Sequence, residues 1–162
     1  MKPYHATASR LITAPAKQLY EIIADYRNGH PLILPKAYFV SLQVEEGGFG
    51  AGTIINFQMR ILGKMQTFRA AISEPDPGRV LVESDLDGGV VTTFTVSSVD
   101  GQHSEVEITT DGQTRGDGVM GTLERYLTEK YLRRIYKQEL SLLEATAQNS
   151  PAPKVTDIPT GA

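Results

Sequence analysis

The sequence contains no cysteine and no tryptophan among its 162 residues. Without cysteine the chain forms no disulfide, offers no thiolate nucleophile and builds no cysteine-ligated zinc site, which fits a reducing compartment. The fold therefore depends on side-chain packing. An excess of positive charge is also lacking, because 16 basic residues are set against 19 acidic residues. We expect no nucleic-acid partner, since binding a phosphate backbone needs a basic surface.

Long apolar runs are absent as well. No segment approaches the roughly 18 consecutive apolar residues of a membrane-spanning helix, and residues 1–15 lack the charged start and apolar stretch of a signal peptide. We therefore expect a cytoplasmic protein with no integral membrane association. The 40% of hydrophobic residues is enough for one substantial core. We predict a single domain over residues 1–148 and a disordered tail over residues 149–162, which is rich in proline and small residues.

The first part of the chain predicts a strand followed by two short helices. Residues 4–13 alternate weakly, as in a strand, and Pro15 then lies where a helix tolerates proline, because the first N–H groups of a helix have no partner within it. Apolar residues recur at three- and four-residue spacing over residues 16–25, which predicts an amphipathic helix. Residues 26–35 predict a second, irregular helical segment that its prolines keep short.

From residue 38 the hydrophobic period changes from 3.6 to 2, which predicts strands. Short turns with glycine, proline or aspartate separate six of them, which is typical of an antiparallel meander. The strands are expected over residues 38–45, 55–61, 65–74, 80–85, 90–99 and 104–111. The helical period then returns over residues 116–148, and the wide apolar stripe of this long helix needs the inner face of the sheet as its partner.

This order of elements is that of the α+β helix-grip fold, and the chain resembles the START-like (SRPBCC) superfamily, especially its bacterial polyketide cyclase/dehydrase and lipid-transport group. The resemblance covers residues 3–148. It is carried by the segment 12–25, the proline-bounded stretch ending at Pro35, the Gly50-Ala51-Gly52-Thr53 strand start, the Pro75-Asp76-Pro77-Gly78-Arg79 turn and the last helix. Many members have tryptophan where this chain has Tyr20, which weakens the assignment to a subgroup more than the fold.

The resemblance implies a curved antiparallel sheet of about seven strands that wraps around the long C-terminal helix and leaves a cavity for an apolar or aromatic ligand. The periodicity supplies candidate lining residues, which by default are also core residues. The apolar candidates are Val40, Ile55, Phe57, Met59, Val82, Phe94, Met120, Leu123, Leu127 and Tyr131, and the polar candidates in register with them are Tyr38, Ser84, Thr92 and Thr110. A buried hydroxyl must find a hydrogen-bond partner, so the polar candidates are the more informative ones.

The orientation of Arg69 is open. In one strand register Arg69 faces the helix, whereas the other register turns Phe68 and Ala70 inward and Arg69 to water. A buried Arg69 would need an anion, either a nearby carboxylate or an acidic ligand. Glu83 is assigned to the solvent face of its strand, where a charged side chain keeps an exposed sheet soluble.

The three histidines share no metal-ligand spacing, so we expect no metal and no cofactor. His30 lies in the second helical segment, near the mouth of the cavity that the resemblance implies. It is interpreted either as a surface cap or hinge residue, or as an acid, a base or a ligand contact that titrates near neutral pH.

The leading hypothesis is a noncatalytic or weakly catalytic protein that binds a small hydrophobic or aromatic molecule, lipid- or polyketide-like. The alternative is a cyclase or aromatase in which Tyr38, His30 or Arg69 polarises a carbonyl group; this hypothesis requires a strongly perturbed ionisable group inside the cavity. A further alternative is a protein-interaction module, as in toxin-like or co-chaperone-like members, with an exposed apolar patch and a homodimer or other partner. Ligand identity, catalysis and oligomeric state stay open.

Overall fold

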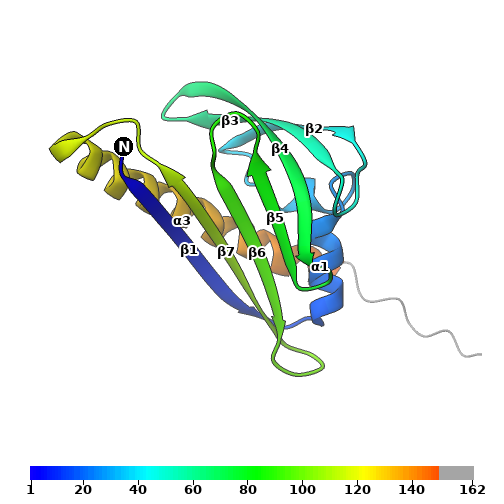
Figure 1. Ribbon diagram of the computed structural model, residues 1–162. Helices are drawn as coiled ribbons and strands as arrows, with labels where there is room; N and C mark the ends of the chain where they lie inside the picture. Colours follow the sequence, from blue (N-terminus) through cyan, green and yellow to red (C-terminus); the bar gives the residue numbers. More distant parts are fainter. Residues whose placement is uncertain (150–162) are drawn as a thin grey trace, which may run out of the picture.

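One curved antiparallel sheet lies in front of a long helix in the computed structural model, which describes residues 1–149 (Figure 1). The strands are β1 (Pro3–Ile12), β2 (Phe39–Glu46), β3 (Ile54–Ile61), β4 (Lys64–Asp76), β5 (Val80–Asp85), β6 (Val91–Ser98) and β7 (Ser104–Gln113), and the helices are α1 (Ala16–Ala24), α2 (His30–Ile33) and α3 (Gly118–Asn149). The predicted tail lies outside the described residues, apart from Asn149, which ends α3.

The seven strands follow the order β1-β7-β6-β5-β4-β3-β2, so each strand from β2 to β7 pairs with its neighbour in the chain. Only β1 pairs with a strand distant in sequence, β7, and it closes the meander at that edge. These elements confirm the predicted α+β helix-grip architecture. Within residues 1–149, none of the helices has the length and apolar character needed to cross a membrane.

Helix α1 starts directly after Pro15, which has an extended backbone (φ −63°, ψ 143°) and lacks the N–H that a helix start leaves unpaired. Its buried side chains, among them Leu19 and Ile23, face the core. After α1, a bend brings Tyr26 and the short helix α2 back over the same interior, where both Tyr26 and His30 are buried. The two short helices therefore close the end of the sheet where α3 finishes, next to α1 (Figure 1).

The two halves of α3 differ in their environment. In the second half, Ile135, Leu140 and Leu143 are almost completely buried against the sheet and the short helices. The first half lies beside the start of β1, where the Glu129 carboxylate accepts a hydrogen bond from the His5 N–H at 3.1 Å. Figure 1 shows that these first turns project past the sheet, which is shorter than a helix of 32 residues.

This overhang corrects the prediction that the whole apolar stripe of α3 is covered by the sheet. Met120 is 69% exposed, Leu123 is 50% exposed and Leu127 is 53% exposed, so these three predicted lining residues lie outside the interior. Helical periodicity identifies an apolar face but does not show how far the surface that covers it extends.

The orientation of β5 is also corrected. Leu81 pairs with Phe94, and Glu83 pairs with Thr92. Because directly opposed residues in an antiparallel ladder lie on the same face, Leu81 and Glu83 face the interior, whereas Val82 and Ser84 face outward. The prediction that Val82 and Ser84 line the cavity and that Glu83 faces solvent is therefore wrong. The prediction assumed that an apolar valine faces inward, but Val82 occupies an outward-facing position of β5.

Two further predicted lining residues lie outside. A β-bulge between Phe39 and Ser41 interrupts the alternation of β2, and Val40 between them is 49% exposed. In β4, Phe68 pairs with the inward-facing Phe57, which turns the next residue, Arg69, to the outer face. There the Arg69 guanidinium donates to the Glu45 carboxylate at 2.7 Å. The register that the sequence left open is thus the one that places Arg69 in water.

A glycine positions α2 and with it His30. A Cβ atom added to Gly29 would lie 2.4 Å from the carbonyl oxygen of Ile22, so the main chains of α1 and of the α2 start approach closely. We expect Gly29→Ala to lower the free energy of unfolding by about 1–3 kcal/mol, the usual cost of overpacking. Urea denaturation measures this change. Gly101→Ala is the matched control, since nothing lies within 4 Å of its Cβ position. An equal loss in both variants would contradict the prediction.

Candidate functional site

The structure brings together one part of the predicted site. The following predicted residues face the space between the sheet and the helices: Ile55, Phe57, Met59, Thr92, Phe94, Thr110 and His30. Tyr38 and Tyr131 form the rim, with their rings in edge contact at 5.4 Å. The Tyr131 hydroxyl also donates to the Arg60 carbonyl at 3.4 Å, which holds α3 beside the end of β3.

An aromatic platform, formed by Phe39, Phe57 and Phe68, lies on the inner face of β2, β3 and β4. The rings of Phe57 and Phe68 stack at 5.3 Å between centroids, and those of Phe39 and Phe57 lie 6.1 Å apart. All three side chains are only partly buried, because α3 approaches β1 most closely and leaves the β2–β4 side of the sheet less covered. The platform is thus apolar surface on the inner face that nothing in the described chain fully covers.

A polar cluster, formed by Tyr26, His30, Glu83, Tyr136 and Glu139, lies deeper in the interior. The Tyr26 hydroxyl donates to Glu83 Oε1 at 2.6 Å, and His30 Nε2 lies 3.5 Å from the same oxygen. The residues come from the turn after α1, from α2, from β5 and from α3, so only the complete fold assembles them.

His30 is held rigidly within this cluster. Its Nδ1 lies 2.7 Å from the Ile23 carbonyl oxygen, and because a carbonyl only accepts, Nδ1 carries the hydrogen. Its ring stacks on Tyr26 at 4.4 Å and meets Phe94 edge-on at 5.6 Å. These contacts leave His30 Nε2 directed at the Glu83 carboxyl. The contact between Nε2 and the carboxyl oxygen is favourable when one of the two atoms carries a proton. Of the two interpretations of His30, the buried position excludes a surface cap.

Glu139 is the more deeply buried of the two carboxyl-bearing residues of the site, with 3% of its surface exposed. Burial raises the pKa of the Glu139 carboxyl well above its usual range, and the nearby charge of Glu83 raises it further. Among residues 1–149 the Glu139 carboxyl has no hydrogen-bond partner. Every polar side-chain atom in this part of the chain that lacks a partner is accessible to a water molecule. The Glu139 oxygens therefore stay within reach of a water molecule.

Tyr136 lies one helical turn before Glu139 and links α3 to the sheet. Its hydroxyl is hydrogen-bonded to the Thr110 hydroxyl, which is bonded in turn to the Thr92 hydroxyl at 2.8 Å. Burial, together with the charge of Glu139, raises the pKa of Tyr136, so the hydroxyl stays neutral. The threonines thus have the partners that buried hydroxyls require.

Four members of the polar cluster were not predicted as site residues: Tyr26, Glu83, Tyr136 and Glu139. A signal for Glu83 was present, because the turn between β5 and β6 places it opposite Thr92, which the alternation of β6 already turned inward. Glu139 lies three residues after Tyr136, within the buried stripe of α3. Helical periodicity marks that position as buried, but the charge of glutamate argued against it.

Elsewhere the ionisable groups stand apart from the site. His5 pairs with Asp111 at 2.7 Å on the exposed surface, and His103 caps its own turn through Asp100. No group of three metal-ligating side chains occurs within the described part of the chain. An open concavity of about 470 Å³ lies against the first turns of α3, lined by Leu123, Tyr126 and their neighbours. It contains no buried ionisable group, so the interior polar cluster is the better candidate site.

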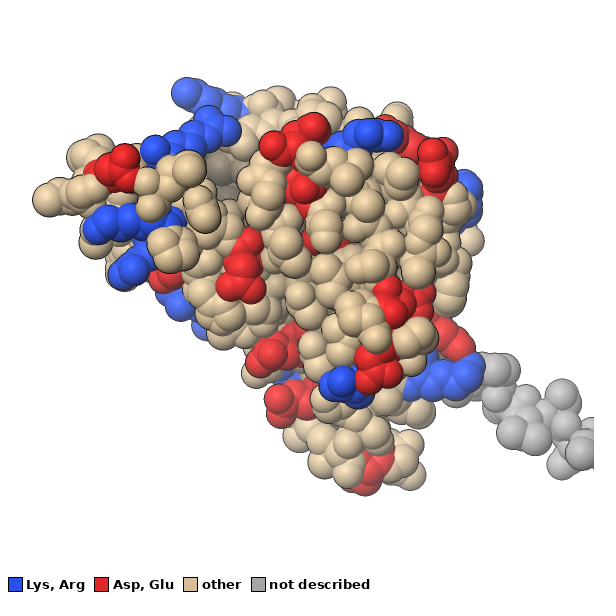
Figure 2. All heavy atoms as spheres, viewed as in Figure 1, with Lys and Arg blue, Asp and Glu red and all other residues tan. Residues whose placement is uncertain are grey.

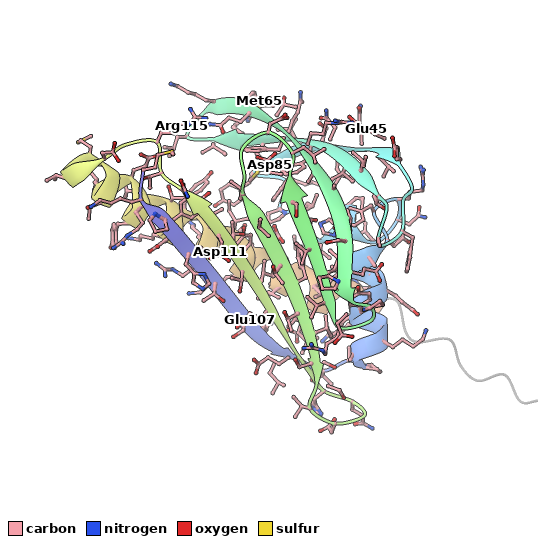
Figure 3. All side chains as sticks on the ribbon, in the orientation of Figure 1. Glu45, Met65, Asp85, Glu107, Asp111 and Arg115 are labelled. Carbon is pink, nitrogen blue, oxygen red and sulfur yellow. The ribbon has the colours of Figure 1, made fainter. Side chains whose placement is uncertain are left out.

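The outer face of the sheet carries scattered charges of both signs, while basic side chains gather at the end where α3 begins (Figure 2). On β7, Glu107 and Asp111 lie along this outer face (Figure 3). These residues are separated from the polar cluster by the sheet itself. They provide carboxylates for control substitutions that leave the interior untouched.

Residues 3–148 match the family model described as polyketide cyclase/dehydrase and lipid transport. Among solved structures, the chain is similar to the KanY protein, with 27% identity, a TM-score of 0.76 and coverage of 90% of this chain and 97% of that one. It is also similar to the Zhui aromatase/cyclase from Streptomyces sp. R1128, with 19% identity, a TM-score of 0.74 and coverage of 93% and 97%.

A START superfamily protein from Mycobacterium smegmatis shares the fold at 13% identity, with a TM-score of 0.71 and coverage of 91% of this chain and 99% of that one. A comparison with curated protein sequences gives no match. At these low identities the likeness to the Zhui and START superfamily structures establishes the fold alone. The family model confirms the predicted resemblance to the polyketide cyclase/dehydrase and lipid-transport group.

The raised pKa of Glu139 predicts a pH dependence of stability. The folded state holds the Glu139 proton more tightly than the unfolded chain, so this contribution is complete below the unfolded pKa of about 4.3 and is lost as pH rises toward the raised folded pKa. We therefore expect the stability difference between wild type and Glu139→Gln to shift against wild type above about pH 4.5. Its slope approaches at most about 1.4 kcal/mol per pH unit, the limit for one proton.

Urea denaturation of both proteins between pH 5 and 8 measures this difference. Glu107→Gln is the control, because Glu107 is exposed on the outer face of β7. It should follow the wild-type curve. Parallel stability curves for wild type and Glu139→Gln would show that Glu139 ionises freely in the folded protein.

Proposed function

The chain belongs to the polyketide cyclase/dehydrase and lipid-transport family of the START-like superfamily, and we propose that it binds a small hydrophobic or aromatic ligand between its sheet and α3. The observation that carries this proposal is the aromatic platform. Three phenylalanine rings on an inner sheet face stay only partly buried, although an ordinary core covers such rings completely.

The spacing between the platform and the polar cluster supports a ligand with one apolar and one polar end. Phe68 and Ile72 lie on the same face of β4, and Ile72 pairs with Glu83. Four residues of a strand span about 13 Å, so a ligand that reaches from the platform to Glu83 has about the length of a bicyclic ring system with a short arm. Apolar lining with few oriented polar groups is typical of small-molecule sites.

Binding can be tested with a neutral apolar probe. We expect Nile red to bind wild-type protein with increased fluorescence, and Phe57→Leu to weaken its binding about fivefold, because losing one aromatic contact costs about 1 kcal/mol. Phe49→Leu is the matched control: Phe49 is 59% exposed in the loop between β2 and β3, away from the platform. Its affinity should equal that of wild type.

Native mass spectrometry and organic extraction of the purified protein provide an independent test. We expect an apolar molecule to be retained or, after extraction, to be bound again. A protein that retains no apolar molecule and takes up neither Nile red nor extracted lipid would refute the proposed function.

The second candidate is a cyclase or dehydratase acting on a polyketide-like chain, and the observation that favours it is the position of Glu139. A carboxyl group with a raised pKa is able to donate a proton to a carbonyl oxygen. His30 and Glu83, which lie 3.5 Å apart, provide a group that accepts the proton from the attacking carbon. An intramolecular carbon–carbon bond would then form while the carbonyl oxygen takes the Glu139 proton and becomes a hydroxyl. The proton taken from the carbon would return to Glu139; loss of a second proton from that carbon to His30 or Glu83, with protonation of the hydroxyl by Glu139, would then form a carbon–carbon double bond and release water.

This candidate makes a separate prediction. A short synthetic poly-β-ketone should close to an aromatic product faster with wild-type protein than without it, as followed by absorbance and mass spectrometry. Glu139→Gln should lose at least tenfold of the acceleration, since general acid catalysis contributes about 10²–10⁴-fold, whereas Glu107→Gln should keep it. Binding of the poly-β-ketone without acceleration would leave ligand binding as the function.

A further inference from the structure

The interior has an unbalanced set of charged groups. Two carboxyl-bearing residues, Glu83 and Glu139, face it, whereas no lysine or arginine is among the buried residues of the described chain. Arg69, the one basic residue considered for the interior, lies on the outer face with Glu45. An acidic ligand would therefore meet carboxyl groups and no fixed cation.

The two carboxyl groups differ in the number of hydrogen-bond partners that they have. Glu83 accepts from the Tyr26 hydroxyl at 2.6 Å and faces His30 Nε2 at 3.5 Å. Glu139 has no hydrogen-bond partner among residues 1–149, although it is 3% exposed and its oxygens stay within reach of a water molecule. A buried carboxyl group without a partner costs free energy, and the cost is lowest when the group is neutral or meets a cation. Glu139 is thus the open position of the polar cluster.

We propose that Glu139 binds the protonated amine of a hydrophobic ligand, with Glu83 as the second carboxyl group near it, so that the site selects basic ligands and rejects acidic ones. This proposal rests on the proposed function, because it assigns the polar end of the ligand whose apolar end lies on the aromatic platform. A ligand of this class is an aromatic ring system with an amine on a short arm.

The proton balance of this step is defined. The amine arrives as an ammonium ion and keeps its proton, while Glu139 releases its carboxyl proton to solvent and becomes the counter-ion. The groups that act on Glu139 from the surrounding elements are Tyr26, Glu83 and Tyr136, and His30 lies next to Glu83. Burial and the charge of Glu83 raise the pKa of Glu139, which favours its protonated form before the ligand arrives. One proton is therefore released for each amine bound.

The test compares naphthalene probes that share the ring and differ in the group on it. 2-Naphthylmethylamine carries the cation, 2-acetylnaphthalene is neutral, 2-naphthoate is the anion, and 2-methylnaphthalene reports the apolar contribution alone. Isothermal titration calorimetry at pH 6.5 measures their affinities for wild type, Glu139→Gln and Glu107→Gln. Repeating the amine titration in two buffers of different ionisation enthalpy measures the proton released.

We expect wild type to bind the amine at least tenfold more tightly than the ketone and the ketone at least tenfold more tightly than the carboxylate. Amine binding should release close to one proton. In Glu139→Gln the preference for the amine should fall below threefold and the proton release should disappear, whereas Glu107→Gln should behave as wild type.

The outcomes that overturn the inference differ from those that overturn the proposed function. If none of the probes binds, methylnaphthalene included, the proposed function itself fails. If the neutral probes bind but the carboxylate or the ketone equals the amine, the selection of basic ligands is wrong and ligand binding stands. If the amine preference or the proton release persists in Glu139→Gln, Glu139 is not its partner.

Discussion

The burial of one carboxyl group, that of Glu139, is the constraint on which the arrangement of the interior depends. A charged carboxylate removed from water costs several kcal/mol unless a partner compensates it, and no lysine or arginine is buried in the described chain. Protonation of the group lowers this cost, and the burial of Ile135 and Leu140 on the same helix offsets it. The helix that completes the core therefore also carries its least compensated polar group.

The fold was predictable because its signals are local and repeated. Alternation with period 2, short turns and a final helical run identify a meander and a closing helix, and Pro15 marks the start of α1. The site was less predictable, because it depends on features that periodicity does not record. A β-bulge turns Val40 outward. On β5, Val82 lies on the outer face and Glu83 on the inner face. The first turns of α3 extend past the sheet that covers the rest of the helix. In each place tertiary geometry overrode the hydrophobic pattern.

The aromatic platform and the polar cluster occupy different strands for a physical reason. Helix α3 lies closest to β1 and β7, and the short helices α1 and α2 cover the neighbouring part of the inner face. Side chains there are buried, and Thr110 and Tyr136 satisfy each other's hydroxyls, whereas Glu139 has no such partner in the described chain. The inner face of β2–β4 lies farther from α3 and carries large apolar rings instead. Curvature of the sheet around an off-centre helix thus separates an apolar surface from a polar end.

The same geometry links ligand charge, proton position and stability. Between Glu83 and Glu139 the interior supports at most one uncompensated negative charge at low cost, since a second one is opposed both by desolvation and by the first. A ligand cation removes this limit, because it lets both carboxyl groups ionise next to a positive partner. A ligand anion adds a third acidic group to the same small volume. Both proposed functions, ligand binding and proton transfer to a carbonyl oxygen, depend on whether the Glu139 carboxyl is protonated.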